Sequence, residues 1–177
     1  MPVTPYNRTA GYATMAGMNR LCLPIGLLGL VVAMLLPGCQ AKHASPEDEV
    51  RALIYGAVAA AEQKNIGKLS DSISRKYADD QGRNKRAVES LLRLHFLRNE
   101  SVHLYAHIQS VTLTQPDHVQ ASVLVAMAGV PIVSAQDLPA LIADLHRFEI
   151  DFAHEGRAWH VQRATWRRAE LGEFLSP

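Results

Sequence analysis

The chain has 177 residues, of which 18 are Lys or Arg and 17 are Asp or Glu, so its formal net charge at pH 7 is +1. Such an even balance provides no basic surface for nucleic acid and argues against that class of partner. Both cysteines, Cys22 and Cys39, precede residue 40. The rest of the chain can therefore form no disulfide, thiolate nucleophile or zinc–thiolate site.

An uncharged, mostly apolar stretch, Leu21 to Leu36, precedes Cys39. It is shorter than the roughly 20 apolar residues of a membrane-spanning helix and typical of a signal-peptide core. Its end, Leu36-Pro37-Gly38-Cys39, resembles the signal of bacterial lipoproteins, which are cut just before an acylated cysteine. We interpret residues 1–38 as this signal peptide, with Met18 as an alternative start, and Cys39 as the lipidation site. The alternative is an uncleaved N-terminal anchor helix.

Cleavage there would leave 139 residues, enough for one domain. Loss of Arg8 and Arg20, the only charged residues of the leader, would change the net charge from +1 to −1. Residues 39–45 would form a lipidated tether. Gln40 follows the cysteine where a retention signal would have Asp, so the resemblance implies a periplasm-facing anchor in the outer membrane rather than the inner membrane.

Helical patterns come first in the domain. Ser45-Pro46 followed by acidic residues predicts a helix start, and apolar residues at spacings of three and four predict a helix to about Lys64. A shorter helix is expected after Asn65, and a third from about Asn84 to Asn99, with His95 at the edge of the core.

The apolar period then changes to two, which predicts strands. The first starts at about Val102, with a bulge near Ser110 where the apolar phase shifts. Three more strands are expected, at about 119–127, 148–152 and 159–166, with one helical turn at 138–143. Helices followed by strands predict an α+β fold, in which the helices pack on the concave face of a curved, four-stranded antiparallel sheet.

Two stretches add a family resemblance. Residues 74–85, from Ser74 to Lys85, and the closing hairpin from Phe148 through Trp159 to Trp166 resemble bacterial lipoproteins of the nuclear transport factor 2-like superfamily. The resemblance implies a cone-shaped domain, assigned here to residues 46–170 with a C-terminal tail at 171–177, often with a pocket. The superfamily includes ketosteroid isomerase, dehydratases, cyclases and non-catalytic modules, so fold alone does not define function.

Tyr77, Asp79 and Asp80 form the strongest polar cluster for catalysis. A pocket carboxylate with a raised pKa could act as a general base beside a tyrosine hydroxyl. Equally, an aspartate just before a helix can cap its free N–H groups, and a tyrosine can be a core residue. Their spacing does not match a calcium loop.

The histidines predict no metal site. His103 and His107 share a strand face but lie about 13 Å apart at roughly 3.3 Å per residue, too far for one zinc ion. His154 and His160 flank a turn and lack a third ligand. No cofactor is expected.

Aromatic residues mark a second set of candidates, for a pocket or an interface: Tyr105, Trp159 and Trp166. In an unbroken strand the two tryptophans would point to opposite faces, and a bulge would change this. The polar outer face that contains Tyr105 is either hydrated or a homodimer contact.

These observations favour a lipid-anchored, non-catalytic module that binds a small apolar ligand or an envelope protein. The alternative is an isomerase, dehydratase or cyclase that uses Asp79 or Asp80 with Tyr77.

Overall fold

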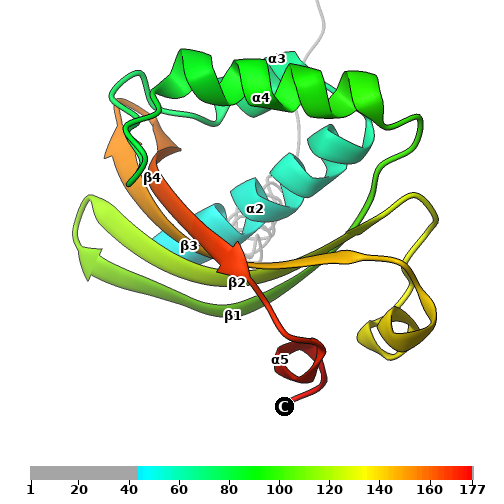
Figure 1. Cartoon of the computed structure of the whole chain (residues 1–177). Helices are drawn as coiled ribbons and strands as arrows, with labels where there is room; N and C mark the ends of the chain where they lie inside the picture. The colour runs from blue at the N-terminus through cyan, green and yellow to red at the C-terminus, as the bar shows by residue number, and fades with distance from the viewer. Residues whose placement is uncertain (1–43, 177) are drawn as a thin grey trace, which may run out of the picture. The chain divides into compact units, whose positions relative to one another are not determined.

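The computed structural model describes residues 44–176, and the predicted leader and Cys39 lie outside these residues. Three helices precede a four-stranded antiparallel meander in the order β1-β2-β3-β4, and the helices lie over the concave face of the curved sheet (Figure 1). The α+β prediction is confirmed. The elements are α2 (Pro46–Glu62), α3 (Ile66–Asp71), α4 (Lys85–Arg98), β1 (His103–Gln115), β2 (His118–Ala128), the 3-10 helix η1 (Ala135–Ala140), β3 (Asp144–Glu155), β4 (Ala158–Arg168) and α5 (Leu171–Leu175).

Helix α2 begins as its sequence predicts. The Ser45 hydroxyl accepts a hydrogen bond from the Asp48 amide at 3.1 Å, and Pro46 occupies the first turn, where its missing N–H has no partner to lose. The apolar face of α2 packs against the concave face of the sheet. Together they form the first core cluster, which consists of Val50, Ile54, Val119, Ala121, Val123, Phe152 and Trp159.

A second core cluster lies on the convex face of the sheet and was not predicted. Leu124 and Ala126 on β2 are fully buried there beneath Leu138 of η1 and Phe174 of α5. Two expectations change as a result. The helical turn falls at 135–140 rather than 138–143, and the segment beyond residue 170 forms a packed helix rather than a tail. The physical reason is that Phe174 buries its ring against this face.

Ionic contacts fix α5 in place. Glu173 lies 2.9 Å from the Arg147 guanidinium and 2.8 Å from that of Arg167. The hydrogen bonds from Arg167 and from the Glu170 amide, together with the nearby positive charge, lower the pKa of Glu173 to about 2.

Three register shifts interrupt the sheet, one of them near the end of β1, between Leu113 and Gln115. The register of β1 against β2 shifts between Ile108 and Ser110, which confirms the bulge predicted near Ser110. In β4, Val161 pairs with Phe152 and Arg163 with Asp151, so Gln162 is an extra residue. This bulge in β4 reverses the alternation, so the condition of an unbroken strand is not met and Trp159 and Trp166 lie on the same face. Trp159 joins the first core cluster, and Trp166 stacks on Phe148 of the same face.

The free edge of β4 is covered by the chain that follows α3. The Ser74 amide donates to the Val161 carbonyl at 2.9 Å, and the Ala78 amide donates to the carbonyl of the bulged Gln162 at 3.2 Å. This pairing protects a sheet edge that would otherwise be open to other chains. Both core clusters draw only on residues 43–177, which form one compact unit. We therefore expect this unit to fold without the residues before it.

Candidate ligand cavity

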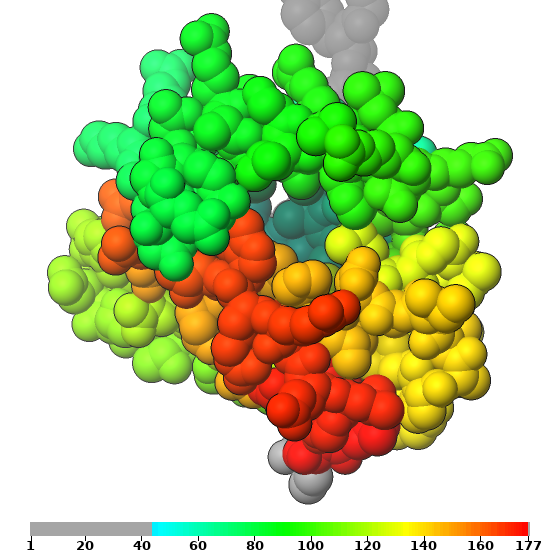
Figure 2. Space-filling view, in the orientation of Figure 1, coloured from blue at the N-terminus to red at the C-terminus, as the bar shows by residue number. Residues whose placement is uncertain are grey.

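A cavity of about 360 Å³ lies between α2, α4 and the concave face of the sheet. This volume falls within the range of roughly 300–1,000 Å³ for small-molecule sites. Figure 2 shows an opening beneath α4 through which the interior of the domain is visible. The lining residues are Leu53, Ile54, Ala57, Val58, Ala61, Leu69, Ser72, Leu92, His95, Phe96, Val102, Leu104, Val123, Val125, Met127, His146, Phe148, Ile150, Phe152 and Val161.

The lining is apolar apart from Ser72, His95 and His146. The Ser72 hydroxyl donates to the Leu69 carbonyl at 2.7 Å and is already satisfied. His95 has only a long contact with the Asn99 side-chain amide, 3.4 Å from either ring nitrogen. The histidines are therefore the titratable groups that face this cavity among residues 44–176.

A second hollow of about 430 Å³ lies on the outer side of the same wall, between α4 and the β3–β4 edge. We call it the outer groove. It shares Leu92, His95 and Phe148 with the cavity, so the two hollows adjoin. The remaining groove residues are Val88, Leu91, Leu94, Arg98 and Trp166.

Helix α4 forms the roof over both hollows; polar contacts hold both of its ends, and the Ser70 hydroxyl of α3 donates to Glu89 within it at 2.5 Å. None of its residues is buried. Near its start, the Lys85 ammonium donates to the Ile73 carbonyl at 2.9 Å. Beyond its end, the Lys64 ammonium donates to the carbonyls of Asn99 at 2.6 Å and Glu100 at 2.7 Å. The Lys64 contacts place a positive charge at the negative, C-terminal end of the helix dipole.

The predicted catalytic cluster does not line the cavity. Asp79 accepts hydrogen bonds from the Gln81 amide at 3.0 Å, and from the amide and Nε of Arg83 at 2.8 and 2.6 Å. Burial raises the pKa of Asp79, but these hydrogen bonds outweigh it and leave the pKa below its ordinary value. Asp79 therefore organises the loop before α4, whereas the helix cap itself is Asn84, whose side chain accepts from the Ala87 amide at 3.1 Å.

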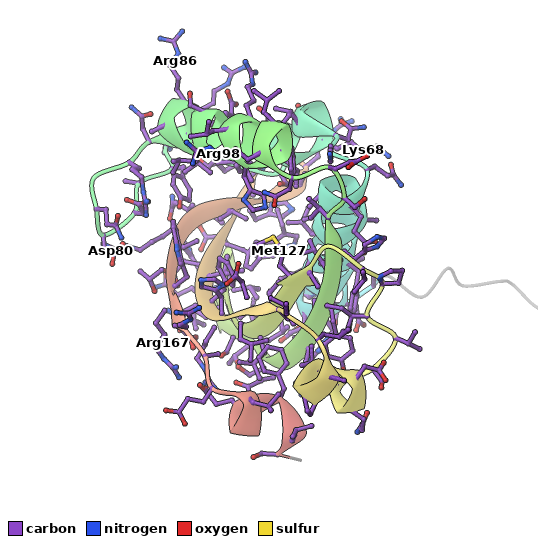
Figure 3. All side chains as sticks on the ribbon, turned by 45° about the vertical axis from the view of Figure 1, so that its right-hand side comes forward. Lys68, Asp80, Arg86, Arg98, Met127 and Arg167 are labelled. Carbon is purple, nitrogen blue, oxygen red and sulfur yellow. The ribbon has the colours of Figure 1, made fainter. Side chains whose placement is uncertain are left out.

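The other two members of that cluster are also outside the cavity. Tyr77 is buried, and this burial raises the pKa of its phenol, with a further contribution from Asp79. Asp80 is exposed at the tip of the loop and lies away from Met127, which marks the cavity (Figure 3). The structure places neither carboxylate where it could reach a ligand in the cavity.

The aromatic candidates fall in three different places. Tyr105 packs against the convex cluster. Trp159 is a core residue whose indole N–H donates to Glu49 Oε2 at 2.9 Å, which joins β4 to α2. Trp166 alone lines a hollow, the outer groove, and the Arg83 guanidinium lies 4.4 Å above its ring. Within residues 44–176, no three His, Cys, Asp or Glu side chains gather in a way that could hold a metal ion.

Sequence reasoning did not identify His146 and Arg98 as groove or cavity residues, and it placed His95 only at the core edge. The sequence contains one signal for the cavity, because α2, α4 and β3 each carry large apolar side chains, and in the structure these side chains face one space. Their volumes and the sheet curvature decide whether that space is filled, and a single sequence does not encode this in a readable way.

Comparison with solved structures identifies the fold as nuclear transport factor 2-like, also described as cystatin-like or ketosteroid isomerase-like. A domain of unknown function with a cystatin-like fold, from Nostoc punctiforme, is 12% identical with a TM-score of 0.56, over 72% of this chain and 80% of that one. A hexachlorocyclohexane dehydrochlorinase from Novosphingobium barchaimii is 10% identical with a TM-score of 0.54, over 69% and 85%.

A third similar structure, Bd1075 of Bdellovibrio bacteriovorus, is 12% identical with a TM-score of 0.53 over 68% of this chain, which spans only 40% of Bd1075. No family model and no curated protein matches the sequence. Identities this low establish the fold and leave the function open. Among the helices of residues 44–176, none is long and apolar enough to cross a bilayer.

Proposed function

We propose that this domain is a non-catalytic binding module that holds a small apolar molecule in the cavity beneath α4. The observation that carries the proposal is an apolar space of about 360 Å³ in the middle of the fold. Voids in protein cores destabilise the folded state, on the order of 20 cal/mol per Å³ in mutational series. An occupant that binds only the folded state would offset that loss.

The chemistry of the lining supports binding over catalysis. Asp79 is engaged by three hydrogen bonds from Gln81 and Arg83, and its pKa is lowered, whereas a general base at neutral pH needs a raised one. The alternative enzyme would require Asp79 or Asp80 to reach the cavity. Neither carboxylate is among its lining residues.

A neutral fluorescent probe tests the proposal directly. We expect N-phenyl-1-naphthylamine to bind residues 43–177 with enhanced fluorescence and to raise the Tm of the domain. Ala57→Phe would fill the cavity, since Ala57 lines it, and should weaken binding at least about tenfold. Ala59→Phe is the matched control, because Ala59 is exposed on the same helix. Absence of binding to the unmodified domain, or equal binding by the two variants, would contradict the proposal.

We further propose that Cys39 carries lipid and holds the domain on the periplasmic side of the outer membrane. The support is the apolar run that ends in Leu36-Pro37-Gly38-Cys39; two or more acyl chains would make such attachment stable. Radiolabelled palmitate should be incorporated into the full chain and not into Cys39→Ser. Continued labelling of Cys39→Ser would refute the site, and recovery in the inner-membrane fraction would refute the location.

A protein partner or a second copy of the chain remains a further proposal for the exposed surface. Its support is the part of the convex face that η1 and α5 leave uncovered, where Ser122 donates to Glu149 at 2.8 Å and Gln120 to Asp151 at 2.9 Å. Sedimentation equilibrium should show a dimer if this face joins two copies. A monomer at all concentrations would remove the homodimer and leave only a different protein as partner.

A further inference from the structure

The polar groups around the two hollows share one chemistry. His95 borders both the cavity and the outer groove, His146 borders the cavity, and Arg98 borders the groove. All three carry nitrogen donors, which are two imidazoles and one guanidinium. Within residues 44–176, no Asp or Glu side chain lines either hollow. A ligand with an apolar body and a negative end would meet complementary surfaces at both of its ends.

Arg83 extends this donor set at the side of the groove. Its Nε is bound to Asp79 at 2.6 Å, and its guanidinium lies over Trp166, a groove residue. Its Nη2 is buried and has no hydrogen-bond partner among the described residues. A buried donor left without a partner destabilises the fold, so an acceptor supplied beside Trp166 would be favoured.

In the part of the chain that the structure describes, no carboxylate pairs with His95 or Arg98. Arg98 is exposed and makes no ion pair with any residue in 44–176. His95 has only its long contact with Asn99. The side chains of His95 and Arg98 can therefore still donate hydrogen bonds to a ligand. Arg147 and Arg167, in contrast, are engaged by Glu173 on the convex side.

We propose that the ligand is an amphipathic carboxylic acid, a free fatty acid, whose chain lies in the cavity and whose carboxylate lies beneath α4 at His95 and Arg98. This assignment rests on the proposed binding function and adds the class of ligand. Each methylene taken from water into the cavity strengthens binding through the hydrophobic effect. The carboxylate contributes charge-assisted hydrogen bonds and selects an acid over a neutral chain. A lipid acyl ester has the same chain without the charge, so it should bind less well.

Displacement of N-phenyl-1-naphthylamine from residues 43–177 distinguishes a preference for a free fatty acid from a preference for an uncharged chain. Dodecanoate should compete about tenfold more strongly than 1-dodecanol or methyl dodecanoate at neutral pH. Arg98→Gln and His95→Gln should each weaken dodecanoate about five- to tenfold and leave 1-dodecanol unchanged, the modest size reflecting the exposure of the site. Arg86→Gln is the matched control, because Arg86 points away from the cavity on the outer side of α4 (Figure 3).

The outcomes are distinguishable. Equal competition by dodecanoate and 1-dodecanol, unaffected by the two variants, would overturn the assignment of an acid and leave the binding function intact. If neither compound displaced a bound probe, the assignment of a fatty acid would fail and the binding function would stand; if the probe itself did not bind, both proposals would fail. Arg98→Gln should retain the circular dichroism spectrum of the parent domain, since Arg98 is exposed. Loss of selectivity in Arg98→Gln with a normal spectrum would be the supporting result.

Discussion

Helices α2 and α4 both cover the concave face of the sheet, and they are packed in opposite ways. α2 buries Val50, Ile54 and Ala60, and its apolar face forms the first core cluster together with β2, β3 and β4. α4 buries no residue at all, and Leu97 is 85% exposed. Both sequences have the same amphipathic pattern. The pattern identifies a helix face, and only the arrangement of the sheet decides whether that face meets a packed surface or a cavity.

The difference assigns separate tasks to the two helices. α2 contributes to the stability of the domain through burial. α4 is held at its ends by Lys64 and Lys85 and by the Ser70–Glu89 hydrogen bond to α3, and its sheet-facing side lies over the cavity. Elements with few buried side chains open at lower free energy than the core. We therefore expect α4 to be the element through which a ligand enters.

The largest expected effect comes from the core of α2. Ile54 is 7% exposed, and Ile54→Ala should lower the free energy of unfolding by about 2–4 kcal/mol. Leu97→Ala in α4 should change it by less than about 0.5 kcal/mol, because its side chain is already in water. Urea unfolding followed by circular dichroism measures both values. Equal losses for the two variants would show that the helices contribute alike.

The next effect concerns the hydrogen bonds of Lys64 beyond the C-terminal end of α4. Lys64→Met keeps the aliphatic stem and removes the ammonium that binds the carbonyls of Asn99 and Glu100. We expect a loss of about 1–2 kcal/mol. Hydrogen exchange should accelerate in residues 85–98 and stay unchanged in residues 50–60. Uniform acceleration across both helices would mean that α4 does not open separately.

The loop that leads into α4 offers a matched pair of carboxylates. Asp79→Asn should lower Tm, since the neutral amide loses the ionic contact with Arg83 and weakens the acceptors that hold the loop. Asp80→Asn should leave Tm unchanged, because Asp80 is exposed. The lowered pKa of Asp79 means that its contribution is present above its ordinary pKa of 3.8 and fades as the pH falls below it. Identical thermal scans for the two variants would contradict this role.

The smallest effect extends the comparison to α5 on the convex face. The pKa of Glu173 falls from 4.5 to about 2 on folding, so its contribution is complete above pH 4.5 and declines as the pH falls toward 2. Glu173→Gln should lower Tm at pH 7, and the gap to the parent protein should close across that interval. Glu100→Gln, at an exposed position, should show no such change. If the difference in Tm between the parent protein and Glu173→Gln did not change with pH, the contacts of Glu173 with Arg147 and Arg167 could not be its source.

Much of the fold follows from local pattern. The Ser45 cap, the helix periods and the strand order all agree with the structure, as does the bulge near Ser110, where the apolar phase visibly shifts. The bulge at Gln162 leaves no comparable phase shift in the sequence, so the placement of Trp166 was predicted only for an unbroken strand. The convex cluster had a usable signal: residues 123–128 are apolar in both phases of β2, which indicates burial on both faces.

The candidate site was harder to predict from the sequence than the fold. Tyr77, Asp79 and Asp80 form a conspicuous polar cluster in the sequence. In the structure Tyr77 is buried, Asp79 is hydrogen-bonded to Arg83, and Asp80 is exposed to solvent. His95, His146 and Arg98 come from two elements about fifty residues apart, and only the folded sheet brings them to two adjoining hollows.

The sequence by itself determined the class of fold and the order of its elements, because these depend on short-range periodicity; it is also the sole basis of the proposed anchor at Cys39, which rests on contiguous residues. The tertiary structure decided that the space beneath α4 is hollow, which side chains face it and which carboxylates do not. Those properties depend on sheet curvature, on the bulge in β4 and on the volumes of side chains far apart in the chain. They are set by packing, which no local pattern specifies.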